Sequence, residues 1–249
     1  MLSQYNEENF AILQQTAQAR LRPDNISGWF LVTFIYSTIM LITAAFAVMT
    51  TPLFDTNWFL VPFFAAISWL VHLVLMLVFI SERVAYKLQR LQAVALCFIA
   101  GKLSIEGYMI YFLICADQDA DLYMYVVGLV LLAGGFLLMI VSTIRAFRAV
   151  RRGDLREDGN GLFQYTSRWL LSVVTAVIAL IFISNYVVRF LPVEVTNASF
   201  GAYFGLFLFA GIQYLMAMAT SEFFLLTYCK FRYHSFIVEP PIRNRKQKR

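Results

Sequence analysis

Two charged side chains, Lys102 and Glu106, lie near the middle of the apolar run from 95 to 112. They are four residues apart, so on a helix they share one face and can reach each other. A lone charge at the centre of a bilayer costs about 2.5–3.5 kcal/mol on insertion scales, and pairing lowers that cost. The pair therefore has two interpretations: a pathway for a substrate, an ion or a proton, or a neutralised contact that fixes helix packing, which we favour slightly.

Three other polar side chains interrupt apolar runs at related depths. His72 and Gln213 are expected at the level of the pair, and Glu222 about two turns closer to the cytoplasm, where Lys102 can reach it instead of Glu106. Taken singly, His72 fits a hydrogen-bonded packing residue, and Gln213 a polar contact between helices. The sequence thus predicts one polar layer with Glu222 below it, and the members of the layer are His72, Lys102, Glu106 and Gln213.

The residues give little support for catalysis or for a metal centre. The HExxH, G-x-S-x-G and P-loop signatures are absent, and "GKLS" at 101–104 lacks the upstream glycine of a P-loop and lies inside an apolar run. Two histidines and three scattered cysteines provide few ligands for a metal centre. We interpret the cysteines, Cys97, Cys115 and Cys229, as packing residues. We expect no cofactor and no metal, and an enzyme is a minor alternative.

The composition indicates a protein that lives in a membrane. The 249 residues are 60% hydrophobic and only 14% charged, which is more apolar and less charged than a soluble domain. The net charge of +5 does not predict nucleic-acid binding, because the basic residues flank hydrophobic runs and are not interleaved with aromatics on a solvated face. We therefore expect a multi-pass integral membrane protein, in the cell membrane or, as the alternative, in an organelle membrane.

Six segments are long and apolar enough to cross a hydrocarbon core about 30 Å thick. The predicted fold is an all-α bundle of six transmembrane helices, in a domain that covers residues 28–229. Residues 1–27 precede it as an interfacial amphipathic helix or a frayed polar tail, and residues 230–249 follow as a basic tail. The expected spans are 28–50, 58–81, 91–115, 122–145, 168–190 and 200–229.

The basic residues predict the orientation of the bundle. They gather before the first span, between spans two and three, between spans four and five, and after span six, whereas the opposite loops are acidic. Because basic residues concentrate on the cytoplasmic side of membrane spans, both termini are expected in the cytoplasm. Contact with anionic lipid or with a protein partner is expected at the loop 151–161 and at the tail, through Arg151, Arg152, Arg243, Arg245, Lys246, Lys248 and Arg249.

Two functional hypotheses from different classes remain. The first is a non-catalytic membrane subunit of a larger complex, which packs through its helices and contacts partners or anionic lipid through its basic loop and tail. The alternative is a permease or channel-like transporter in which Lys102, Glu106 and Glu222 line the path. The sequence shows no energy-coupling domain and no internal repeat, so we favour the subunit.

Overall fold

In the computed structural model the described residues are 5–50, 57–118, 120, 122–159, 161 and 193–241, with backbone alone for Thr50, Tyr123 and 193–201. Every secondary-structure element within these ranges is a helix, so the all-α prediction is confirmed for this part of the chain. The predicted span at 168–190 lies outside the described residues. The same holds for the tail cations Arg243, Arg245, Lys246, Lys248 and Arg249.

Five helices of the described chain are long and apolar enough to span a membrane, and they fall on the other five predicted spans. They are α2 (Pro23–Thr50), α3 (Leu60–Phe79), α5 (Gln89–Asp117), α6 (Leu122–Arg152) and α8 (Val193–Arg232). The shorter elements are η1 (Glu7–Phe10), α1 (Ala11–Gln18), η3 (Asn57–Phe59), α4 (Glu82–Lys87) and η4 (His234–Phe236).

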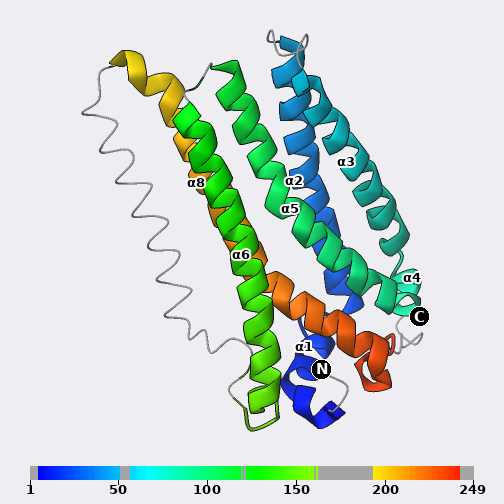
Figure 1. Ribbon diagram of the computed structural model, residues 1–249. Coiled ribbons are helices and arrows are strands. Elements are labelled where there is room, and N and C mark those ends of the chain that lie inside the picture. The colour runs from blue at the N-terminus through cyan, green and yellow to red at the C-terminus, as the bar shows by residue number, and fades with distance from the viewer. Residues whose placement is uncertain are drawn as a thin grey trace.

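Helix α5 is the most buried of the five long helices and forms the centre of the bundle. Figure 1 shows α2 and α3 on one flank of α5, with α8 and α6 on the other. The close packing of α8 depends on Gly107 of α5, because a β-carbon there would come within 2.4 Å of the Phe209 ring. The absence of a side chain at Gly107 therefore lets α8 approach α5 closely.

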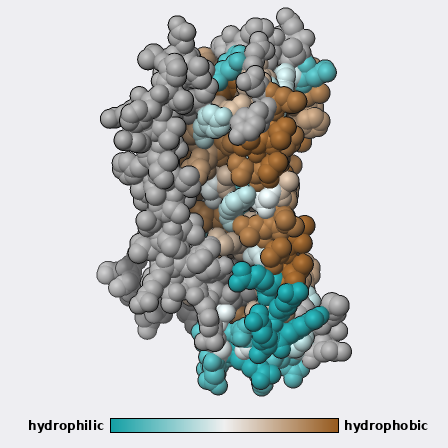
Figure 2. Space-filling model, turned by 60° about the vertical axis from the view of Figure 1, so that its left-hand side comes forward, coloured by the Kyte–Doolittle hydropathy of each residue, from teal (hydrophilic) through white to brown (hydrophobic). Residues whose placement is uncertain are grey.

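Several segments that are far apart in the sequence meet at one end of the bundle, which we call the basic end. Figure 1 places α1, α4, the end of α6 and the end of α8 there. The cations of this end include Arg20, Lys87, Arg148, Arg151 and Arg232. Figure 2 shows hydrophilic residues gathered at the lower end of the visible face and apolar residues above them. The molecule thus separates a charged end from an apolar body.

The amino-terminal segment is folded against the basic end. Phe10, Leu13 and Ala17 are almost fully buried and belong to the same core cluster as Leu226 and Phe236. The sequence left an interfacial helix and a frayed tail as alternatives for this segment, and in the structure its apolar face is covered by protein. The helical spacing of these residues is the one that the sequence predicts, but the surface on which they pack comes from the other end of the chain.

A tight turn after α6 completes this contact. Helix α6 continues past the predicted end at 145 because its last turns bury Ala146 and Val150 while arginines face outward. Gly153, at φ +81°, then reverses the chain. The turn brings Leu155 back toward the amino terminus, where its carbonyl oxygen accepts a hydrogen bond of 3.0 Å from the Ile12 amide.

Candidate functional site

Lys102 and Glu106 form an ion pair on α5 in the structure. Both side chains point into the bundle, where Lys102 is 7% exposed and Glu106 is 5% exposed. Their spacing of one helical turn places the ammonium directly against the carboxylate. The charges therefore neutralise each other within a single helix, in surroundings where an isolated charge would be costly.

Ser37 of α2 bridges the two charged groups. The Lys102 Nζ atom donates to Ser37 Oγ at 2.7 Å, and Ser37 Oγ donates to Glu106 Oε2 at 2.8 Å. Ser37 is fully buried. Because a hydroxyl can both accept and donate a hydrogen bond, one serine satisfies both partners and fixes α2 against α5.

His72 adds α3 to this group of residues. Its Nδ1 atom lies 3.5 Å from Lys102 Nζ and 3.5 Å from Ser37 Oγ. Its Nε2 atom lies 3.2 Å from the carbonyl oxygen of Phe30, which can only accept. This geometry assigns the imidazole proton to Nε2 and leaves Nδ1 as an acceptor that faces Lys102.

These contacts define the polar cluster, which consists of Ser37, His72, Lys102 and Glu106, with Thr33 Oγ1 3.4 Å from His72 Nε2. Aromatic side chains lie beside it: the Phe34 ring meets the His72 ring edge-on, at 87° and 5.6 Å between centroids. Chemically, the cluster can do two things. It can exchange protons among its members, or it can hold α2, α3 and α5 together through saturated hydrogen bonds.

Gln213 and Glu222, the remaining polar candidates of the long helices, make their contacts elsewhere. Gln213 Nε2 donates to the carbonyl oxygen of Leu132 at 2.9 Å, and its side chain lies against Gly135 of α6. Helix α8 thus turns Gln213 toward α6, whereas the polar cluster faces α2 and α3. Of the four residues predicted in one polar layer, His72, Lys102 and Glu106 come together and Gln213 does not. The three are hydrogen-bonded to Ser37, which the sequence analysis did not predict.

Glu222 lies at the basic end, where it binds Arg20 instead of Lys102. Arg20 Nη2 donates to both carboxylate oxygens, and its distance to Oε2 is 2.5 Å. The Glu222 side chain is 6% exposed and that of Arg20 is 62% exposed. Lys102 does not take the alternative partner Glu222, because it is engaged by Glu106 and Ser37 one level further into the bundle.

A second buried contact at the basic end is centred on Gln89. Its side-chain oxygen accepts from Lys230 Nζ at 3.1 Å and from the Val238 amide at 3.0 Å, and its Nε2 donates to the Val238 carbonyl at 2.6 Å. Lys230 is fully buried. The amide of Gln89 therefore connects the start of α5, the end of α8 and the segment after η4.

The two arginines of α6 that were predicted to contact lipid or a partner lie at the surface of the basic end. Arg151 and Arg152 are exposed in the last turn of α6, and Arg152 Nε lies 3.7 Å from Asp154 Oδ2. Arg156, which sequence analysis did not single out, donates to Asn9 Oδ1 at 3.0 Å. The turn after α6 is thus held to the amino-terminal segment.

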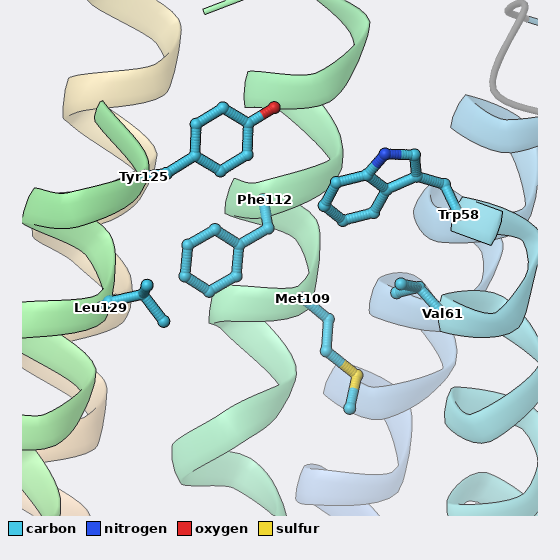
Figure 3. Close-up of a pocket in the computed structure, with 6 residues that line it drawn as sticks. All are labelled: Trp58, Val61, Met109, Phe112, Tyr125 and Leu129. Atoms are coloured by element: carbon cyan, nitrogen blue, oxygen red, sulfur yellow. The ribbon is translucent and has the colours of Figure 1, made fainter. Parts of the chain in front are cut away.

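An apolar hollow of about 320 Å³ lies on the flank of the bundle, toward the end opposite the basic end. Figure 3 shows its lining side chains, which come from η3, α3, α5 and α6. Among the described residues, no three His, Cys, Asp or Glu side chains come together as metal ligands would. The lining of the hollow is Trp58, Val61, Met109, Phe112, Tyr125 and Leu129.

Comparison with known proteins gives this chain no relative. No protein-family model, no curated protein and no solved structure matches it.

Proposed function

We propose that the protein is a non-catalytic, multi-pass subunit of a larger membrane complex, with the basic end and both termini in the cytoplasm. The observation that carries the proposal is the closed hydrogen bonding of the polar cluster. Lys102 and Glu106 bind each other, and Ser37 binds both, so the charges in the bundle are used to hold helices together.

The basic end supports both a contact with a partner and the proposed cytoplasmic position. Its short segments are not independent loops, because Phe10 and Leu13 are buried against the end of α8, and Arg156 binds the amino-terminal segment. A fixed surface that carries Arg148, Arg151 and Arg152 suits an acidic protein partner or anionic lipid headgroups. The excess of cations at this end also supports its cytoplasmic position.

Purification in a mild detergent tests the subunit assignment. The tagged chain is expected to bring down defined companions at a fixed ratio, and a monodisperse particle of this chain alone would contradict the proposal. The variant Arg151→Glu with Arg152→Glu should lose an acidic companion. The matched variant Arg83→Glu with Lys87→Glu changes the same charge on α4, at the other side of the basic end, and should keep it.

Labelling of introduced cysteines tests the orientation. In a chain without its three native cysteines, Arg151→Cys and Arg245→Cys should both react from the cytoplasmic side with a reagent that does not cross membranes. Labelling of the two positions from opposite sides would overturn the proposed topology.

A permease or channel-like transporter is the second candidate, and one observation favours it. His72 Nδ1 lies within hydrogen-bonding reach of Lys102 Nζ, so proton-exchanging groups of α3 and α5 are in contact. On this hypothesis Glu106→Gln abolishes flux in reconstituted vesicles while the chain still inserts and folds. Unchanged flux in that variant removes the pathway hypothesis.

A further inference from the structure

The apolar hollow exists because two helices flank α5 without packing on each other. Helix α3 packs against α2, α4 and α5, whereas α6 packs against α5 and α8. The outward face of α5 is therefore left as a floor between two walls, and its residues Met109 and Phe112 stay only partly buried. One wall includes the ring of Tyr125, which lies parallel to the Phe112 ring with 5° between the planes and 6.3 Å between the centroids.

The side chains around the hollow are graded in polarity along the bundle axis. Figure 3 shows Trp58 and Tyr125 with the indole nitrogen and the hydroxyl toward the same end, the end to which α5 runs. Met109, one turn earlier on α5, and Leu129 lie deeper, toward the middle of the bundle. Indole and phenol rings with one polar atom prefer the level of lipid headgroups, whereas the purely apolar residues suit hydrocarbon.

The two helices that flank the hollow, α3 and α6, carry exposed apolar side chains. On the α3 side Phe63 and Phe64 are 56% and 58% exposed, and on the α6 side Val126 and Val130 are 47% and 64% exposed. Exposed apolar residues on both flanking helices are typical of a surface that faces lipid chains.

We propose that the hollow binds one acyl chain of a membrane lipid, with the headgroup beside Trp58 and Tyr125 and the chain running along α5 toward Met109. The inference rests on the membrane location in the proposed function. The grading explains why a lipid fits better than the helix of a second copy, because a lipid is polar at one end and apolar along its length. The volume, about 320 Å³, suits a chain and not a whole lipid.

Quenching of Trp58 fluorescence by a lipid that carries bromine on its acyl chain tests this site. The chain has four tryptophans, and Trp58 is left alone by the changes Trp29→Phe, Trp69→Phe and Trp169→Phe. Brominated phosphatidylcholine is titrated into the detergent-solubilised protein. Trp58 emission should fall steeply and level off near about one lipid per protein, as expected for a single pre-formed site.

A control variant with its single tryptophan outside the hollow measures unspecific contact with the surrounding lipid. It carries Val130→Trp, at an exposed position of α6 that does not line the hollow, together with Trp58→Phe and the same three other changes. Its emission should fall gradually with the bulk fraction of brominated lipid. The unaltered protein with all four tryptophans should show both components, which guards against a folding defect in the single-tryptophan chain.

Three outcomes would overturn the inference, and they are distinguishable. Identical gradual curves for the two chains would mean that the hollow holds no bound chain. A Trp58 that resists quenching and becomes more shielded as protein concentration rises would mean that a second copy fills the hollow. If neither chain is quenched even in reconstituted vesicles, the membrane location itself fails, and with it the proposed function.

Discussion

The polar cluster and the basic end both place charges in apolar surroundings, but they do so with partners of different kinds. In the polar cluster Lys102 and Glu106 are both buried and are neighbours on one helix. At the basic end Glu222 is buried, whereas its partner Arg20 is largely exposed and 202 residues away in the sequence. A charge that is buried together with its partner should therefore cost more to unpair than a buried charge whose partner can return to water.

The largest expected effect is the loss of one partner inside the polar cluster. Lys102→Met leaves the Glu106 carboxylate buried without a counter-charge, so the free energy of unfolding should fall by roughly 3–5 kcal/mol. Denaturant unfolding in detergent measures it. Lys87→Met, the same change at an exposed position of α4, is the control and should have little effect. Equal losses in the two variants would mean that the buried Lys102 contributes no more to stability than an exposed lysine.

The Arg20–Glu222 pair should show an asymmetry that the polar cluster lacks. Arg20→Ala leaves a buried carboxylate unpaired and should cost about 1–3 kcal/mol of unfolding free energy. Glu222→Gln should cost less, because the exposed guanidinium of Arg20 is then solvated by water. The same unfolding assay compares them, and a larger loss for Glu222→Gln would contradict the difference in exposure that we infer.

A smaller and more local effect is expected at Gln89. Gln89→Leu keeps a side chain of similar length but removes both hydrogen bonds to Val238 and the acceptor of Lys230. Hydrogen exchange at the Val238 amide should accelerate about tenfold, which corresponds to roughly 1.4 kcal/mol of local opening.

Gln14 supplies the control for this measurement, because it makes one hydrogen bond to the same region, from its Nε2 to the Ser235 carbonyl at 3.3 Å. Gln14→Leu should leave exchange at Val238 nearly unchanged. If both variants accelerate it equally, Gln89 has no special part in holding the segment after η4.

The smallest expected effect concerns salt. Raising the ionic strength from about 0.05 M to about 0.5 M should reduce the cost of Arg20→Ala by a fraction of a kcal/mol, because Arg20 is in contact with solvent. The cost of Lys102→Met should not change, because the buried pair is not screened. A strong salt dependence of the Lys102 variant would mean that water and ions reach the polar cluster.

The sequence predicts the ion pair of the polar cluster but not its third partner. The spacing of Lys102 and Glu106 is a property of one helix, so it needs no knowledge of the fold. Ser37 depends on how α2 is rotated against α5, which an evenly apolar span does not reveal. The four-residue spacing of Thr33 and Ser37 was a usable signal, since both hydroxyls face His72 in the structure.

The basic end was less predictable, for the same physical reason. The helical spacing of Phe10, Leu13 and Ala17 predicts an apolar face but not what covers it, and the covering residues come from the other end of the chain. Glu222 has its partner in a segment that precedes the first span. When only the estimated depth in the membrane is considered, Lys102 is the nearest cation to Glu222, and the sequence does not indicate Arg20.

We infer that Lys102 and Glu106 stabilise each other and serve to hold the bundle together. A double-mutant cycle on the free energy of unfolding tests it directly, with Lys102→Met, Glu106→Leu and the two combined. We predict that the double variant recovers most of the stability that Lys102→Met loses, because apolar side chains replace a buried ion pair at little cost. A double variant whose loss equals the sum of the two single losses would contradict the claim.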